Sequence, residues 1–425
     1  MSTADPRRLL RGAFDAAVDA ARPHLCVPAA LPEPPRGRTV VVGMGKAAAE
    51  MALAVERHWR GDLEGLVVTA AGHGCACSRI EVREAGHPLP TAAGLEAARD
   101  IVSRVQGLGR DDLVLCLLSG GGSALAPWPV AGVSLEEKQR ITAALLRSGA
   151  PIREINCVRR HLSQIKGGRL GVACQPARLV TLAISDVPGD DPLDIASGPT
   201  VPDPTTTHDA LAIVDRRGIG IGERLRGEWG NGAHESVKPR DPRLATPDVR
   251  IVASAATSLA AAARYLGQHG VQACVLSDRV EGEAREVGSA QAAIVASVLR
   301  DGSPCAPPCV LLSGGETTVT VRGNGRGGRN VEYLLGLGLA LEPGQGVHAL
   351  AADTDGIDGT APYAGATWSP DTAARATGLG LDLRAHLDAN DAHALFEALG
   401  DSLATGPTRT NVNDFRAIFV PARGG

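Results

Sequence analysis

The segment RTVVVGMGKAAAE, residues 38–50, is the part of the chain that decides the fold. Its β-branched and apolar residues 39–42 predict a buried strand, and the alanines after the glycines predict a helix. Gly43 and Gly45 lie between these elements and predict a tight turn. A strand, a glycine turn and a helix N-terminus in this order expose backbone N–H groups at the positive end of the helix dipole. The segment therefore predicts a βα unit whose turn binds an anion.

Lysine is a rare choice in this chain, which has 43 Lys and Arg residues but only four lysines. Lys46 directly follows the predicted turn, and Lys166 precedes two further glycines. A lysine ammonium is a compact positive charge that suits a phosphate oxygen. We therefore predict that Lys46 and Lys166 contact phosphate.

The glycine turn matches the dinucleotide fingerprint G-x-G-x-x-A only loosely. A dinucleotide site normally has Asp or Glu about 20 residues later, at the end of the second strand. Here the predicted second strand, residues 63–69, ends in Thr69 and is followed by Ala-Ala-Gly. The missing acid argues against a nicotinamide dinucleotide and favours another phosphate ligand.

The composition excludes several classes of function. The formal net charge is −4 and aromatic residues make up 3% of the chain, so neither a basic surface nor a base-stacking platform for nucleic acid is expected. The N-terminus is polar and no apolar run is long enough to span a bilayer. Nine scattered cysteines are typical of small buried thiols in a reducing compartment. We expect a cytoplasmic protein without membrane or nucleic-acid partners.

Alternating strand and helix patterns predict an α/β protein. At 425 residues the chain is too long for one ordinary core. Residues 226–248 are polar and rich in Gly and Pro, as in a linker. We therefore expect two α/β domains, at residues 1–235 and 249–425. The last strand, residues 415–420, is left free to return to the first domain.

Two serine–glycine turns are predicted to form further nests of backbone donors, each directly after an apolar strand. The residues of these turns are Ser119, Gly120, Gly121, Gly122 and Ser123, and Ser313, Gly314, Gly315 and Glu316. A third segment, residues 322–330, places three arginines among glycines at a predicted helix start. Arg329 has a planar fork suited to carboxylate or phosphate, and Asn330 follows it. These segments predict anion-binding sites in both halves of the chain.

Aspartates follow two of the predicted strands. Asp186 and Asp190 come after the strand at residues 179–184, and Asp353 follows the strand at 347–351. Ligands bind beyond the carboxyl ends of strands in open α/β sheets, and Mg2+ is often held by one or two carboxylates with substrate phosphates. Glycine nests, cations and such aspartates suit phosphoryl transfer. The sequence leaves the base open among the three aspartates, which are also the predicted metal ligands.

Seven motifs together resemble the glycerate 2-kinases, in the family's order and over nearly the whole chain. They are GMGKA at 43–47, GHPLPT at 86–91, LLSGGGSAL at 117–125, SDVPGDDPLDIASGPT at 185–200, SGGET at 313–317, GRGGRN at 325–330 and AADTDGIDGTA at 351–361. The resemblance implies a Rossmann-like N-terminal domain, a smaller C-terminal domain called MOFRL, and an active site in the cleft between them. It implies phosphorylation of D-glycerate to 2-phosphoglycerate with ATP and Mg2+. The family's critical lysine and arginine fall on Lys46 and Arg329.

The chain departs from the family pattern at two positions. Arg409 stands in place of a glycine in TGPTGTNVND, and Val331 replaces a glutamine after Asn330. Both departures affect the expected substrate preference more than the expected reaction. Two alternatives stay open: an NAD(P)H-dependent hydroxypyruvate reductase, a label also used for members of this family, and a non-catalytic anion-binding protein. D-glycerate and ATP are the expected partners, and a homodimer stays open.

Overall fold

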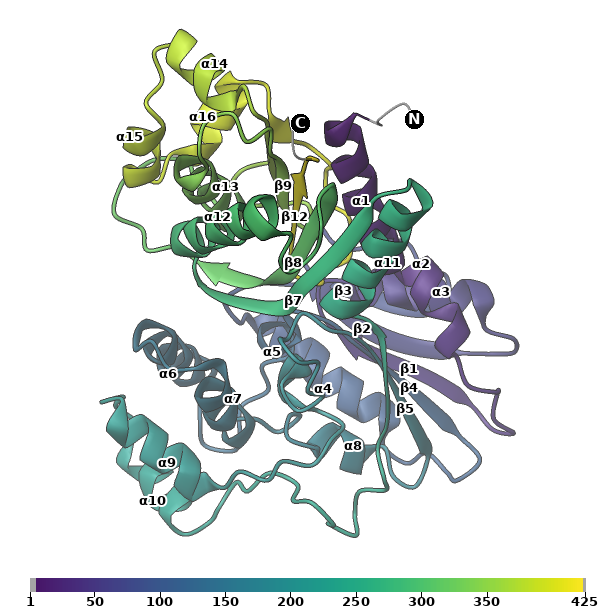
Figure 1. Ribbon diagram of the computed structural model, residues 1–425. Helices are drawn as coiled ribbons and strands as arrows, with labels where there is room; N and C mark the ends of the chain where they lie inside the picture. The colour runs from purple at the N-terminus through teal and green to yellow at the C-terminus, as the bar shows by residue number, and fades with distance from the viewer. Residues whose placement is uncertain (1–4, 423–425) are drawn as a thin grey trace. The chain divides into compact units, whose positions relative to one another are not determined.

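The computed structural model describes residues 5–422 (Figure 1). The chain forms two compact units. One unit is Pro23–Val252, and the other joins the N-terminal segment up to Arg22 to the chain from Ala253 onward. Each unit has its own six-stranded sheet covered by helices, which confirms the predicted α/β class.

The sheet of the Pro23–Val252 unit has the strand order β3-β2-β1-β4-β5-β6. Its strands are β1 (Thr39–Met44), β2 (Glu64–Ala70), β3 (Ile80–Ala85), β4 (Leu113–Leu118), β5 (Arg178–Ile184) and β6 (Asp248–Ala253). Strands β1 to β5 pair in parallel. Both β1 and β4 are buried along their whole length, as the apolar runs of a two-sided parallel sheet require. The chain turns from one half of the sheet to the other between β1 and β4, and such switch points are where open α/β sheets bind ligands.

Helices cover this sheet and build a second apolar cluster beside it. They are α2 (Pro23–Cys26), η1 (Pro28–Ala30), α3 (Ala48–His58), α4 (Ala92–Val105), α5 (Gly122–Leu125), α6 (Leu135–Arg147), α7 (Ile152–His161), α8 (Arg169–Ala173), η2 (Ile195–Ser197), α9 (Thr207–Arg216) and α10 (Glu223–Gly230). The main core includes Val42 of β1, Ile101 of α4 and Cys116 of β4. Helices α6, α7, α9 and α10 enclose the second cluster, with Trp229 fully buried in it.

The other unit has a mixed sheet in the order β11-β10-β9-β12-β8-β7. Its strands are β7 (Gln272–Glu283), β8 (Cys309–Thr318), β9 (His348–Asp353), β10 (Gly365–Trp368), β11 (Ser402–Leu403) and β12 (Asp414–Val420). Its helices are α1 (Pro6–Ala20), α11 (Ala255–Gln268), α12 (Ala284–Asp301), α13 (Arg329–Ala340), α14 (Thr372–Gly378), α15 (Leu383–Asp388) and α16 (Ala392–Ala398). Helices α1 and α11 share one apolar cluster with the sheet, and α12, α13, α15 and α16 share another.

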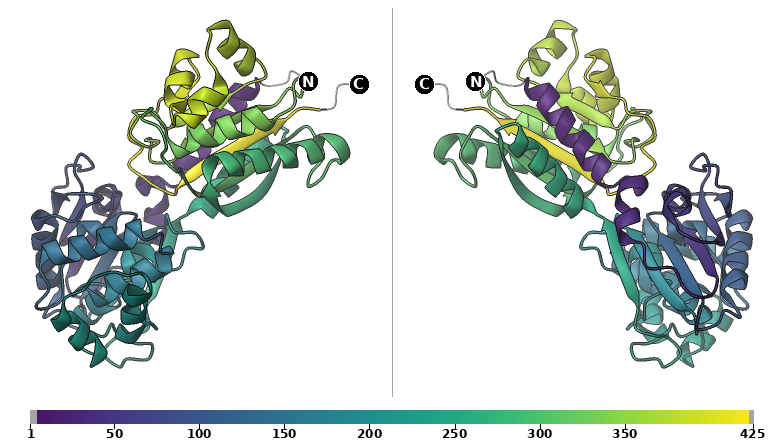
Figure 2. Two further views of the ribbon diagram at one scale, coloured as in Figure 1. Left: turned by 90° about the vertical axis from the view of Figure 1, so that its left-hand side faces the viewer. Right: turned by 90° about the vertical axis from the view of Figure 1, so that its right-hand side faces the viewer.

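The unit boundaries differ from the predicted domains at both ends of the chain. Helix α1 belongs to the second unit and lies beside its strands in both views of Figure 2. Its buried residues Leu10 and Phe14 pack in one core with Leu259 and Phe415. The phenyl rings of Phe14 and Phe415 meet edge to face at 5.7 Å. The predicted 1–235 domain did not account for this packing, because the apolar face of a helix does not reveal which element it packs against.

The strands near the other boundaries also differ from the prediction. Strand β6 extends the first sheet, so the second unit starts at Ala253 instead of residue 249. Strand β12 lies between β9 and β8 and pairs antiparallel with both. The last strand therefore completes the middle of the second sheet and does not return to the first.

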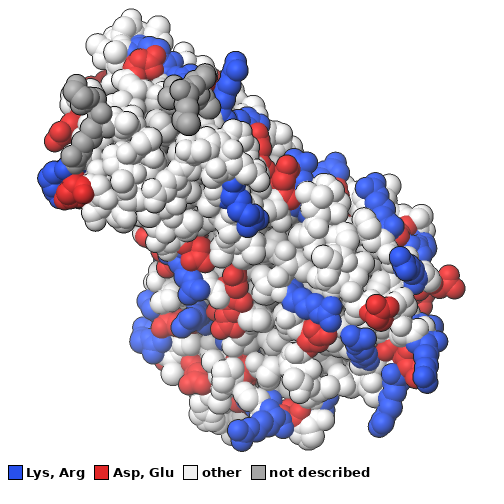
Figure 3. Space-filling model, turned by 45° about the vertical axis from the view of Figure 1, so that its right-hand side comes forward, with Lys and Arg blue, Asp and Glu red and all other residues white. Residues whose placement is uncertain are grey.

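Acidic and basic side chains are interspersed on the face of the molecule shown in Figure 3. This mixture agrees with the formal net charge of −4. Among residues 5–422, no helix combines the length and the apolar character that crossing a bilayer requires.

Candidate functional site

The turn after β1 is built around Gly45. Strand β1 runs on to Met44, so Gly43 lies inside the sheet and not in the turn. A Cβ on Gly43 would lie 2.6 Å from the carbonyl oxygen of Leu117 in β4, which explains the small residue. Gly45 has φ +142°, and a Cβ there would lie 2.1 Å from Oγ of Ser119. Gly43 thus lets the strands pack, and Gly45 lets two turns touch.

Hydrogen bonds on both sides of Lys46 hold this turn against its neighbours. The N–H of Lys46 donates to the carbonyl oxygen of Gly120 at 2.8 Å. The N–H of Ala47 donates to Oγ of Ser119 at 3.0 Å. Thr69, at the end of β2, donates its hydroxyl to the carbonyl oxygen of Lys46 at 3.1 Å. The threonine that stands in place of a ribose-binding acid therefore supports the Lys46 turn.

Residues 119–121 form the predicted turn after β4, and Gly122 and Ser123 begin helix α5. Three side chains converge on this 119–123 turn. Gly121 has φ +80°, and a Cβ there would lie 2.9 Å from ring atoms of His87 and 3.4 Å from Cγ of Lys46. A Cβ on Gly120 would lie 1.9 Å from Oδ2 of Asp186, just after β5. The carboxyl ends of β1, β3, β4 and β5 thus bring Lys46, His87 and Asp186 to one glycine turn.

His87 lies in the GHPLPT segment and is not among the predicted site residues. Its side chain is exposed and lies against Gly121. The available signal was the position of GHPLPT directly after β3, at the same sheet edge as the other turns.

Asp190 lies in the loop after β5 and is partly buried. Its N–H donates to the carbonyl oxygen of Val187 at 3.0 Å, and its φ of +57° places it in the left-handed region. The structure therefore puts Asp190 in a tight turn that begins beside Asp186.

Lys166 does not have the predicted position. Its side chain is fully buried, and Nζ donates to the carbonyl oxygen of Ala126 at 3.0 Å. Burial, together with the nearby charge of Arg159, lowers the pKa of Lys166 to about 7. Lys166 supports the segment after the 119–123 turn from inside the protein and presents no surface to a phosphate.

A second cluster lies in the other unit, around Arg329. Its Nε, Nη1 and Nη2 donate to Asp414 at 2.7 Å, Glu316 at 2.8 Å and Asp353 at 2.5 Å. Burial opposes the charge of Arg329, but Asp414, Asp353 and Glu316 together raise its pKa above the usual range. The guanidinium thus stays charged and organises three carboxylates from β8, β9 and β12.

The N-terminus of α13 carries an anion from the protein itself. The backbone N–H groups of Asn330 and Val331 each donate at 3.1 Å to the carboxylate of Asp358. The amide of Asn330 donates to Asp414 at 2.8 Å. Asn330 therefore links the helix start to the Arg329 cluster, and Asp358 fills the predicted anion position.

The second predicted serine–glycine turn is a strand. Ser313, Gly314, Gly315 and Glu316 all lie in β8, which pairs with β12 and β7. Oγ of Ser313 accepts from Nε2 of Gln291 at 3.1 Å and is buried. Gly315 has φ +124° where the register with β7 shifts, and a Cβ there would lie 2.3 Å from the backbone of Val280. The glycines serve an irregular strand pairing, and only Glu316 reaches the Arg329 cluster.

Comparisons with known proteins match the chain along its length. A family model described as a domain of unknown function, DUF4147, covers residues 9–226, and the MOFRL family covers residues 309–414. A D-glycerate 2-kinase from Thermotoga maritima is 38% identical over 96% of this chain and 98% of that protein. A crystal structure of a glycerate kinase from that organism has a TM-score of 0.89 at 37% identity, covering 98% of this chain and 99% of that chain. The chain belongs to the glycerate kinase family.

This membership confirms the resemblance seen in the sequence motifs. Another relative, from Agrobacterium vitis, is 50% identical over 97% of this chain and 94% of that protein, and is named "Putative hydroxypyruvate reductase". Relatives of this chain are thus named for two activities, a glycerate kinase and a hydroxypyruvate reductase. The choice between the two activities depends on the chemistry of the site.

The two departures from the glycerate kinase pattern have different structural settings. Arg409 has φ +61°, a conformation that favours glycine, which explains why a glycine suits this position. Val331 is fully buried in the core between α13 and the sheet, so an apolar side chain fits its surroundings.

The predicted metal ligands of this glycerate kinase family chain do not form a protein-only metal cage. Within the described part of the chain, no three His, Cys, Asp or Glu side chains are grouped to hold a metal ion. Asp353 is buried and contacts Arg329; burial and Asp355 raise its pKa, against the opposing effect of Arg329. Asp186 is partly buried and lies beside the 119–123 turn. A single carboxylate in this position suits an Mg2+ ion, because Mg2+ is often held by only one or two carboxylates together with substrate phosphates.

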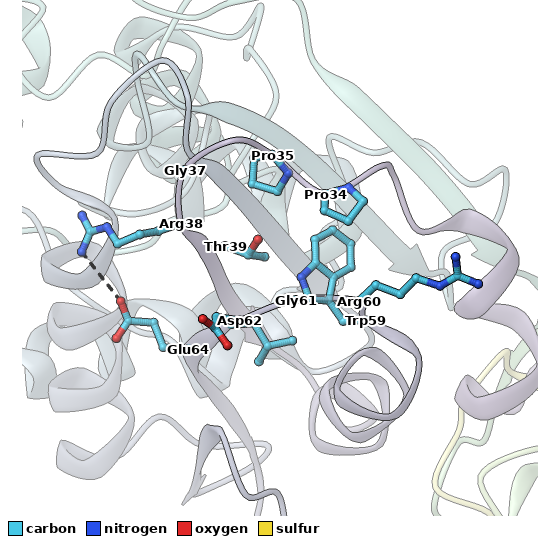
Figure 4. Close-up of a pocket in the computed structure, with 11 residues that line it drawn as sticks. Pro34, Pro35, Gly37, Arg38, Thr39, Trp59, Arg60, Gly61, Asp62 and Glu64 are labelled. Atoms are coloured by element: carbon cyan, nitrogen blue, oxygen red, sulfur yellow. Dashed lines mark ion pairs between the residues drawn. The ribbon is translucent and has the colours of Figure 1, made fainter.

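The cavity shown in Figure 4 lies at the amino ends of the strands of the first sheet, whereas the glycine turns lie at the carboxyl ends. It measures about 360 Å3 and is lined by residues at the amino ends of β1 and β2, including Thr39 and Glu64. Two of the lining residues form an ion pair, with Nη1 of Arg38 3.8 Å from Oε1 of Glu64. It contains none of the predicted site residues, so it does not belong to the candidate site.

Proposed function

We propose that the chain transfers the γ-phosphoryl group of ATP to the 2-hydroxyl of D-glycerate, with Mg2+, and forms 2-phosphoglycerate. The observation that carries this proposal is the convergence of Lys46, His87 and Asp186 on the 119–123 turn. The choice of D-glycerate as the phosphoryl acceptor is supported by the relatives that are named as glycerate kinases.

The glycine turn and Lys46 are suited to hold a phosphate. Phosphoryl transfer needs little covalent chemistry from the protein and depends on positioning and charge neutralisation. Backbone donors of the 119–123 turn offer directed hydrogen bonds, and the Lys46 ammonium offers a compact charge. The hydrogen bonds from Lys46 and Ala47 to Gly120 and Ser119 keep both elements in place before any ligand binds.

The carboxylates after β5 have the remaining roles. Asp186 is close enough to the turn to hold Mg2+ or to accept the proton of the substrate hydroxyl, and Asp190 is the other candidate in the same loop. Mg2+, when bound, neutralises phosphate charge. In the other unit, Arg329 with its carboxylates Glu316, Asp353 and Asp414 is proposed as a separate functional cluster.

The deciding experiment incubates the purified protein with D-glycerate, ATP and Mg2+ and separates 2- from 3-phosphoglycerate by chromatography. We expect ADP and 2-phosphoglycerate in equal amounts. A 3-phosphoglycerate product would overturn the regiochemistry, and no ADP above a control without glycerate would overturn the kinase.

The reductase alternative is tested with the same preparation. The end of β2 carries Thr69, whose hydroxyl binds the carbonyl oxygen of Lys46, and has no acid to hold a ribose. We therefore expect no oxidation of NADH or NADPH with hydroxypyruvate. If the protein binds ATP or D-glycerate in calorimetry but forms no product in Mg2+, the non-catalytic anion-binding alternative is correct.

A further inference from the structure

Three cationic side chains lie together inside the Pro23–Val252 unit without an acid. Lys138 and Lys166 are buried, and each Nζ donates to one backbone carbonyl oxygen, of Leu162 at 3.1 Å and of Ala126 at 3.0 Å. Arg159 is partly buried and donates from Nη1 to Oδ1 of Asn156 at 3.5 Å. Among residues 5–422, none of the three forms an ion pair with a carboxylate.

The neighbouring arginine shows what this cluster lacks. Arg160 contacts two carboxylates, with Nε 2.9 Å from Asp203 and Nη1 3.4 Å from Asp194. The neighbours of Arg159 in this cluster, in contrast, are the basic residues Lys138 and Lys166. Burial and the charges of Lys166 and Arg159 lower the pKa of Lys138, and burial lowers the pKa of Arg159 to about 10. Buried positive charge without a partner is unfavourable, so this cluster would be stabilised by a bound anion.

A chain of hydrogen bonds leads from this cluster to the candidate site. Oγ of Ser123, in the glycine turn, lies 2.7 Å from Oγ of Ser197. Ser197 donates to Oδ1 of Asn156 at 3.2 Å, the same oxygen that Arg159 contacts. Arg159 retains exposed surface, whereas the side chains of both lysines are buried. Arg159 is therefore the member of the cluster that can reach a ligand at the turn.

We propose that Arg159 binds the carboxylate of the hydroxy-acid substrate, with the buried side chains of Lys138 and Lys166 behind it. The proposal rests on the function proposed above and assigns the residue that recognises the acid. A guanidinium fork can bind a carboxylate through two parallel hydrogen bonds. In this arrangement the glycine turn and Lys46 bind phosphate and Arg159 binds the carboxylate. The two anionic groups of the reactants therefore have separate binding residues.

The test compares Arg159→Met with Arg153→Met. Arg153 lies on the same helix, α7, and is exposed. A hydrogen-bonded charge contributes about 1.5–3 kcal/mol, so we expect Arg159→Met to raise KM for D-glycerate roughly 10- to 100-fold. KM for ATP should change less than about twofold, the range of a surface substitution. Arg153→Met should leave both constants unchanged. If KM for ATP rises while KM for D-glycerate does not, Arg159 binds a nucleotide phosphate and the proposal is wrong.

Binding without turnover separates this proposal from the kinase proposal. D-glycerate alone should raise the thermal midpoint of the wild-type protein and of Arg153→Met, whereas glycerol, which has no carboxylate, should not. Arg159→Met should lose this shift. This result would support the role of Arg159 even if the wild-type protein formed no ADP. An unchanged shift in Arg159→Met would contradict the proposal even in an active kinase.

The free protein supplies a second readout that a purely structural role would not produce. Since Arg159 has like charges beside it, Arg159→Met should keep or raise the thermal midpoint without ligand. Arg160→Met should lower it, because Asp203 and Asp194 lose their partner. If both variants lowered the midpoint equally, Arg159 would be a structural residue and the proposal would fail.

Discussion

The hydroxyl oxygen of Ser119 accepts a hydrogen bond from the backbone N–H of Ala47 at 3.0 Å, and so joins the turns that follow β4 and β1. Both groups are buried, and Gly45 beside them leaves no room for a side chain. The two glycine turns thus form one rigid element at the switch point of the sheet.

Ser119→Ala removes this acceptor and leaves the Ala47 N–H without it. A buried unsatisfied donor costs about 1–3 kcal/mol, so the free energy of unfolding should fall by that amount. Chemical denaturation measures it. Ser103→Ala, at an exposed position of α4, is the control and should change stability by less than about 0.5 kcal/mol. Equal effects in both variants would show that the bond does not hold the turns.

Gly120→Ala should displace Asp186, because the new methyl group would lie 1.9 Å from its Oδ2. We expect a loss of kcat of about 10²-fold, as a misplacement of about 1 Å produces, with a smaller effect on folding. Steady-state kinetics and a thermal melt measure the two effects. Gly227→Ala is the control, since a Cβ there has no neighbour within 4 Å. Full activity in Gly120→Ala would remove Asp186 from the machinery.

Lys46→Ala should lower kcat by about 10²–10³-fold, the effect of removing one preorganised electrostatic contact. The thermal midpoint should stay within a degree or two, because the partly exposed side chain adds little to the core. Near-wild-type turnover in this variant would exclude a critical role for Lys46.

Arg329→Lys should damage both stability and turnover. One ammonium cannot reproduce the three contacts to Asp414, Asp353 and Glu316. We expect a loss of roughly 2–3 kcal/mol in the free energy of unfolding, since two of these carboxylates are buried. Arg326→Lys is the control, because Arg326 forms an exposed pair with Glu397, and should lose less than about 1 kcal/mol. If Arg329→Lys behaved like this control, charge alone would be sufficient.

Lys166 predicts a pH dependence of stability. Its pKa falls from 10.5 to about 7 on folding, so the unfolded chain binds more protons between these values. Stability therefore rises with pH across this window and is insensitive to Lys166 below it. Between pH 7 and pH 9.5 the wild-type protein should gain roughly 1–3 kcal/mol relative to Lys166→Met, by this linkage. Denaturation at both values measures the difference, and an unchanged difference would mean that Lys166 stays charged.

Local signals were sufficient where a turn is built from neighbouring residues. The turn at Gly45 and Lys46 and the turn at 119–123 each combine an apolar strand with glycines and a short run of helix. Their geometry depends on φ preferences and strand ends, which a sequence states directly. The edge on which they meet followed from the parallel arrangement of the strands.

Other positions depended on contacts between distant residues. The segment 313–316 has the serine and glycine residues that are typical of a glycine turn. Its pairing with β12 and β7 nevertheless makes it part of a strand. Lys166 has glycine neighbours like Lys46, yet the surrounding core buries its ammonium against Ala126. Periodicity and composition cannot separate such cases, because the difference lies in what packs against them.

The sequence by itself determined that this chain is an α/β protein with glycine turns at strand ends and belongs to a family of kinases, because those features are carried by short runs of residues. Only the tertiary structure decided which charges meet. It placed three carboxylates from three strands on Arg329 and brought His87 and Asp186 to one turn. Among residues 5–422, it left Arg159 without an acid partner. The reason is that burial and electrostatic pairing are set by distance in space, which strand order and helix packing create.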